Sequence, residues 1–165
     1  MPIYSEPLSD GEILKLLKDN YNHVLLLGCG SCMNESLAYK NDLPIFAKDE
    51  SGKIVSYAVH SELIRLTNFL KEQGVNTRYE LLPEGSNSRC MLNYSEELYP
   101  LPLYPRPEII VSLGCPSCKF GIEMMSDGVP VVKATRQLGY LAYGHVTEAD
   151  GTRRIIKEKS RLDRY

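Results

Sequence analysis

The five cysteines have the clearest potential for chemistry in this sequence, and four of them form two CxxC pairs. The first pair is Cys29 and Cys32, the second is Cys115 and Cys118, and Cys90 stands alone between them. Four thiolates around one small volume suit a [4Fe-4S] cluster and also tetrahedral zinc. An odd number of cysteines with CxxC spacing favours metal or redox chemistry in a reducing compartment over a secreted disulfide framework. The pattern therefore predicts one metal centre.

Both cysteine pairs come directly after short apolar runs. The run at 23–27 leads into the first pair, and the run at 109–111 leads into the second. Continuous apolar runs of this length are typical of parallel strands buried on both faces. In open parallel sheets, ligands bind beyond the carboxyl ends of the strands. If the two strands are neighbours, the pairs converge at that edge of the sheet, and Cys90 could reach it from the segment after a further strand.

Three glycines beside the cysteines favour an iron-sulfur cluster over zinc, and they are Gly28, Gly30 and Gly114. Glycine lets the backbone approach a cofactor closely, and amides beside the sulfurs can hydrogen-bond to a cluster and tune its potential. Structural zinc usually holds together small domains that lack a core, and this chain is long enough to bury one. We therefore expect these glycines to line the cofactor site.

Other interpretations of these residues stay open. Zinc would indicate a structural or assembly subunit, whereas the CxxC spacing alone also fits a thiol-disulfide redox protein. An exposed cluster edge could instead bind a substrate and leave one thiol free. Cys90 by itself is equally well explained as a small buried hydrophobe. Asn34, Glu35 and Ser36 could donate hydrogen bonds to the centre, or they could simply form the first turn of a helix.

Strand-like and helix-like segments alternate along the chain, which predicts an α/β fold. The expected architecture is a small, doubly wound parallel sheet of the flavodoxin or Rossmann kind, with a C-terminal β-hairpin. Helices are expected at 12–18 and 59–73, and Gly74 closes the second. Strands are expected at 23–27, 75–82, 108–113 and 129–133, and two hairpin strands at 140–147 and 153–157 around the turn Asp150-Gly151. The segment 39–57 is expected to be a hairpin-like excursion, and 99–107 a stiff proline-rich connector.

The composition limits the classes of partner. A chain of 165 residues with 43% hydrophobic and 24% charged residues fits one domain, 1–165, ending in a basic tail at 152–165. The formal net charge of -2 provides no broad positive field for a nucleic acid. No apolar run approaches the roughly 20 residues that span a bilayer, and residues 1–10 lack the order of a signal peptide. We expect a cytoplasmic protein with no nucleic-acid partner and no membrane span.

The chain resembles a known family in an ordered set of features. These are an early amphipathic helix, the strand followed by Gly-Cys-Gly-Ser-Cys at 28–32, Arg89-Cys90 after the second strand, and Ser-Leu-Gly-Cys at 112–115 after the third. Over residues 6–145 the sequence resembles the N-terminal domain of the small iron-sulfur subunit of bacterial methylenetetrahydrofolate reductase, the MetV type. By position, the resemblance implies Cys29, Cys32, Cys90 and Cys115 as ligands.

The resemblance also implies a function. Proteins of that family carry iron-sulfur clusters and exchange electrons with a flavin-bearing partner in one-carbon metabolism. It therefore implies a cluster-bearing, accessory subunit of a hetero-oligomeric oxidoreductase, without substrate chemistry of its own. The chain departs from the family in placing Cys118 beside Cys115, in having Met33 to Ser36 where another cysteine is common, and in lacking a cysteine-rich C-terminal extension. Spacing thus favours Cys118 as the fourth ligand, and family position favours Cys90.

Overall fold

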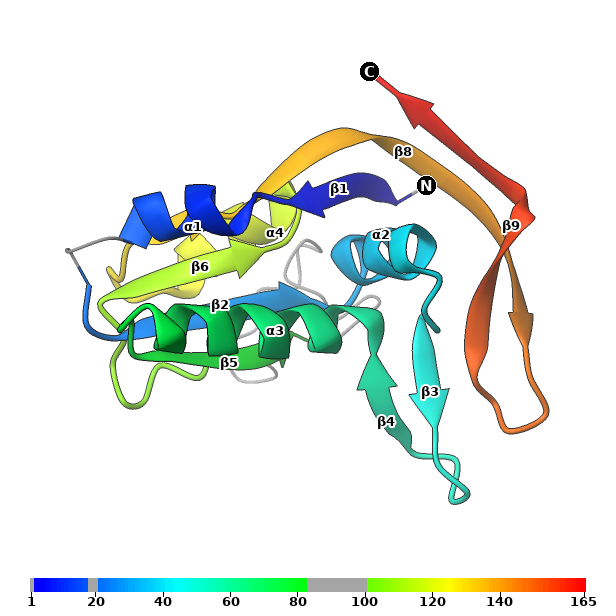
Figure 1. Ribbon diagram of the computed structural model, residues 1–165, viewed down its shortest axis with the longest axis horizontal. Coiled ribbons are helices and arrows are strands. Elements are labelled where there is room, and N and C mark those ends of the chain that lie inside the picture. The colour runs from blue at the N-terminus through cyan, green and yellow to red at the C-terminus, as the bar shows by residue number, and fades with distance from the viewer. Residues whose placement is uncertain (1, 18–20, 83–100) are drawn as a thin grey trace.

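Two sheets and four helices make up the part of the chain that the computed structural model describes, which is residues 2–17, 21–82 and 101–165 (Figure 1). One sheet is parallel with four strands, and the other is antiparallel with five. The mixed α/β class predicted from the sequence is confirmed. Cys90 and the first part of the proline-rich connector lie outside the described residues.

The parallel sheet has the strand order β5-β2-β6-β7. Strand β2 (Val24–Cys29) lies between β5 (Thr77–Leu82) and β6 (Ile109–Leu113), and β7 (Val131–Lys133) forms the edge beyond β6. Every residue of β2 and β6 is buried, as their continuous apolar runs predict. The chain therefore leaves β2 for a neighbour on one side, returns to a neighbour on the other side, and continues outward from there.

Helix α3 (Ala58–Glu72) packs against β5 and β2 and confirms the longest predicted helix. Leu63, Leu66 and Leu70 recur at helical spacing and are fully buried. Gly74 has a φ of +82°, a left-handed conformation that glycine adopts without strain just beyond a helix end.

Three further helices connect the strands. Helix α1 (Asp10–Leu17) corresponds to the predicted helix at 12–18, with a slightly earlier start. Helix α2 (Cys32–Asn41) follows β2 after two residues, and α4 (Pro116–Met125) follows β6. Pro116 occupies the first turn of α4, where its missing N–H leaves no hydrogen bond unmade.

The antiparallel sheet has the order β1-β8-β9-β3-β4 and runs as a curved arm past α2 (Figure 1). Its strands are β1 (Ile3–Pro7), β3 (Phe46–Lys48), β4 (Ile54–Tyr57), β8 (Thr135–Thr147) and β9 (Arg153–Arg164). The predicted C-terminal hairpin is β8 and β9, which are longer than expected, and the excursion at 39–57 contains β3 and β4. Residues 158–164, assigned from the sequence only to a basic tail, instead continue β9, and 161–164 pair with β8. Residues 158–164 contain only one apolar residue, so this segment gives a weaker strand signal than the Asp150-Gly151 turn gives for a hairpin.

Candidate metal centre

Four cysteines lie where two neighbouring parallel strands end and two helices begin. Cys29 is the last residue of β2 and Cys32 the first of α2, while Cys115 precedes α4 and Cys118 lies in its first turn. Because β2 and β6 are hydrogen-bonded neighbours, both loops leave the same edge of the sheet. The structure thus brings these four predicted residues together, and all four are free thiols.

The thiols form hydrogen-bonded pairs between the loops, and these pairs do not follow the CxxC spacing. The Cys118 thiol donates to the Cys29 sulfur, and this hydrogen bond lowers the pKa of Cys29 against the opposing effect of burial. The Cys32 thiol donates to Cys115 and lowers the pKa of Cys115 to about 6. The same contact raises the pKa of Cys32, and burial raises it further. The pKa of one sulfur in each pair, Cys29 and Cys115, is therefore lowered toward the thiolate form that binds metals.

Backbone amides surround the sulfurs. The N–H groups of Ser31 and Met33 hydrogen-bond to the sulfur of Cys29. The N–H of Ile3, from β1, hydrogen-bonds to the sulfur of Cys32. Around Cys115, amides from the first turn of α4 do the same. These donors favour negative charge on sulfur, as amides at a helix N-terminus favour bound anions.

The sulfurs are largely shielded from solvent. Cys29 is 1% exposed, Cys115 2% and Cys118 0%, whereas Cys32 is only half-buried. As the side chains stand, no three or more His, Cys, Asp or Glu residues of the described ranges surround a single ion position. The arrangement is instead two sulfur pairs held side by side by the ends of β2 and β6.

The three glycines expected to line the site have different surroundings. A Cβ on Gly114 would lie 2.7 Å from the Cys118 sulfur, so only glycine leaves room for that thiol. A Cβ on Gly28 would instead lie 2.6 Å from Cδ1 of Leu63, so Gly28 makes space for α3. Gly30 is buried, and its N–H donates to the Leu82 carbonyl at 3.2 Å. Of Gly28 and Gly114, it is Gly114 that approaches a cysteine side chain.

The polar residues after Cys32 connect α2 to other elements. The Asn34 amide donates to the Ile45 carbonyl at 2.8 Å, and its oxygen accepts from the Val59 N–H at 2.9 Å. The Ser36 hydroxyl contacts the carbonyls of Cys32 and Ile3. Asn34 thus lies in the first turn of α2, one of its two predicted roles, and its amide group joins α2 to the segments before β3 and at the start of α3.

Replacing Asn34 with alanine is expected to reduce the free energy of unfolding by about 2–4 kcal/mol, because two buried backbone groups lose their partners. Urea denaturation of the Asn34→Ala variant measures this change. Asn41→Ala, at the exposed end of the same helix, is the matched control and should change the value by less than about 0.5 kcal/mol. Equal effects of the two substitutions would contradict this role of Asn34.

Some residues of the site carry no sequence signal. The Tyr143 hydroxyl, from β8, donates to Oε1 of Glu35 at 2.7 Å, and its pKa is raised mainly by burial and by this contact. Thr135 donates to the Gly114 carbonyl at 2.6 Å. The Ser112 hydroxyl is buried and has no hydrogen-bond partner among the residues that the structure describes. Residues of β1 and β8 reach this region only because the antiparallel sheet closes over α2, which local patterns do not reveal.

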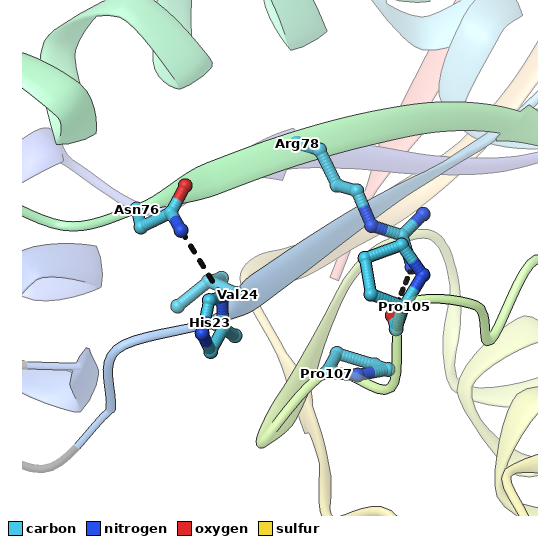
Figure 2. A pocket seen from close by; sticks show the side chains of 6 residues that line it. All are labelled: His23, Val24, Asn76, Arg78, Pro105 and Pro107. Atoms are coloured by element: carbon cyan, nitrogen blue, oxygen red, sulfur yellow. Dashed lines mark hydrogen bonds between the residues drawn. The ribbon is translucent and has the colours of Figure 1, made fainter.

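A small cavity of about 140 Å³ lies at the other end of the parallel sheet, beside the first residues of β2 and β5 (Figure 2). His23 and Asn76 hydrogen-bond to each other there, at 3.0 Å. Arg78 donates to the carbonyls of Pro102 and Pro105, which anchors the proline-rich connector to β5. Ligand pockets are usually larger than this and open at the carboxyl ends of parallel strands. These hydrogen bonds indicate that the cavity lies at a structural contact between β2, β5 and the proline-rich connector.

Comparison with known proteins identifies no relative. No family model, no curated protein and no solved structure matches the chain. Within the described ranges, none of the helices has the length and apolar character needed to cross a membrane. The case for function therefore depends on the chemistry of the four cysteines.

Proposed function

We propose that this protein holds a [4Fe-4S] cluster through Cys29, Cys32, Cys115 and Cys118 and relays electrons to a partner protein. The observation that carries the proposal is the meeting of four thiols from two loops at one edge of the parallel sheet. Four cysteine thiolates are the usual ligand set of such a cluster. Bound there, the cluster would accept and release single electrons.

The surroundings of the sulfurs support iron-sulfur over zinc. Backbone N–H groups of Ser31, Met33 and Ile3 hydrogen-bond to Cys29 and Cys32. Hydrogen bonds to cluster sulfurs are a main means by which proteins set the cluster potential. The domain also has an extensive core of its own, so a structural zinc ion is not needed to hold it together.

The position within the sheet supports a cofactor site. In the order β5-β2-β6-β7, the chain continues from β2 to a neighbour on one side and from β6 to a neighbour on the other side. We interpret this reversal of strand order as a doubly wound sheet of the flavodoxin or Rossmann kind. At such a reversal, the loops after the two strands separate and leave a crevice in which ligands bind. The four cysteines belong to those two loops.

The burial of the cysteines supports an electron-relay role. Cys29, Cys115 and Cys118 are almost fully enclosed, so they exclude water from the interior of the site, while Cys32 is closer to solvent. The side of the site at Cys32 is therefore where electrons would enter or leave. The resemblance to the methylenetetrahydrofolate reductase subunit implies a flavin-bearing partner, a hetero-oligomer and a cytoplasmic location, and these are part of the proposal.

Purification without oxygen tests the proposal. The expected product is brown and contains about four iron and four sulfide per chain, with a broad visible absorption that fades on reduction. Iron, acid-labile sulfide and zinc are measured on the same sample. A colourless protein containing about one zinc per chain would contradict the proposal and support a zinc-binding structural or assembly subunit.

A further inference from the structure

Cys32 and Cys115 form the more accessible of the two sulfur pairs. They belong to different loops, and the Cys32 thiol donates a hydrogen bond to the Cys115 sulfur. Cys32 is half-buried, whereas both members of the other pair, Cys29 and Cys118, are at most 1% exposed. A small reagent therefore reaches the Cys32 side of the site first.

In this structure each cysteine of the loop after β2 has a cysteine of the loop after β6 as its hydrogen-bonded neighbour. Cys29 closes β2 while Cys32 opens α2, and each sulfur hydrogen-bonds to a cysteine of the second loop. The Cys118 side chain also lies close to the backbone of Gly114. A Cβ added to Gly114 would be 2.7 Å from the Cys118 sulfur. Because disulfides form between sulfurs that can approach to about 2 Å with little backbone movement, the neighbours across the loops are favoured.

We infer that the metal-free protein is a thiol switch in which Cys32 and Cys115 form the first disulfide when it meets a low-molecular-weight disulfide. One sulfur of the pair, as thiolate, attacks the reagent, forms a mixed disulfide and expels one thiolate. The second cysteine loses its proton and attacks the mixed disulfide, which expels the second thiolate. The pair loses two electrons and two protons, and the reagent becomes two thiols.

The switch determines whether the site can take up metal. Oxidation removes two of the four thiolates, so the remaining pair cannot complete a tetrathiolate site until a reductant restores Cys32 and Cys115. This regulation concerns the same four residues as the proposed cluster. Its chemistry needs no metal, however, so the two ideas can fail separately.

Disulfide mapping tests the inference. Metal-free protein is treated with oxidised glutathione, denatured in N-ethylmaleimide, and digested with trypsin and a glutamyl endopeptidase. The sequence then yields one peptide, 19–35, with Cys29 and Cys32, and another, 109–119, with Cys115 and Cys118. Both are free of Cys90. The expected main product is these two peptides joined by one disulfide, and mass spectrometry detects it directly.

Matched serine variants identify the sulfurs. Cys32→Ser and Cys115→Ser should abolish the joined peptides, whereas Cys29→Ser and Cys118→Ser should retain them. Fragmentation of the joined peptides from the unchanged protein locates the same bond without any variant, which covers the case of a variant that does not fold. Cobalt(II) added to the oxidised protein should not give the absorption of a tetrathiolate site until a reductant is added.

A bond located by fragmentation between Cys29 and Cys118 would overturn the inference, and so would either of two results of the peptide map. One is a pair of separate peptides, each lighter by two hydrogens, because that mass marks disulfides within the CxxC motifs. The other is full alkylation of all four cysteines after oxidation. Failure of the cluster proposal is measured independently, by the iron and sulfide content of the protein purified without oxygen.

Discussion

Replacing Cys118 with serine is expected to abolish iron and sulfide binding. The Cys118 side chain is fully buried and donates a hydrogen bond to the Cys29 sulfur, so it lies within the site. A serine hydroxyl is a poor ligand for a cluster whose irons are held by thiolates. Losing a ligand should cost more than the roughly 10- to 100-fold in affinity that follows loss of an outer hydrogen bond. Iron and sulfide analysis after purification without oxygen measures the loss.

Cys90→Ser is the matched control, because it removes the one cysteine that the resemblance implies as a ligand in place of Cys118. We expect this variant to keep its iron and its visible spectrum. Circular dichroism of both variants checks that they fold, since Cys118 is a core residue as well. The opposite result, with iron lost only in Cys90→Ser, would assign the ligand set by family position and contradict the assignment from the four converging thiols.

The sequence predicted the position of the site because the relevant signals are local. Two buried apolar runs each end at a glycine and a CxxC pair, and the structure places those runs side by side as β2 and β6. The helix at α3 was equally clear, since Leu63, Leu66 and Leu70 keep helical spacing over its length. Such patterns show which face of a helix or strand is buried, and they can be recognised from residues that are close together in the sequence.

The rest of the site could not be predicted because it depends on contacts between distant segments. The Ile3 amide reaches Cys32 through β1, which pairs with β8 more than 120 residues later in the chain. Tyr143 meets Glu35 for the same reason. The sequence left two roles open for Asn34, a hydrogen bond to the centre or a place in the first turn of a helix, and the second is the one seen in α2. A polar residue after a cysteine motif looks the same whether it faces a cofactor or, as here, joins α2 to the backbone of Ile45 and Val59.

Gly114→Ala is the second substitution with a large expected effect. The new Cβ would stand 2.7 Å from the sulfur and 2.8 Å from the Cβ of Cys118, and Ser112 Oγ would be 3.3 Å away. Because Cys118 is fully buried on α4 and Ser112 on β6, neither can move aside easily. We expect a loss of about 1–3 kcal/mol in the free energy of unfolding of the metal-free protein, the usual cost of overpacking. The displaced Cys118 sulfur should also reduce the iron content strongly.

Gly11→Ala separates this clash from the general effect of replacing a glycine. Gly11 lies in α1, and a Cβ there would meet no atom within 4 Å. Alanine should therefore stabilise the protein by up to about 1 kcal/mol through its higher helix propensity, with the iron content unchanged. Urea denaturation of the metal-free proteins and iron analysis of the loaded ones give the two readings. If Gly114→Ala kept its iron and its stability, Cys118 would not be held against this loop.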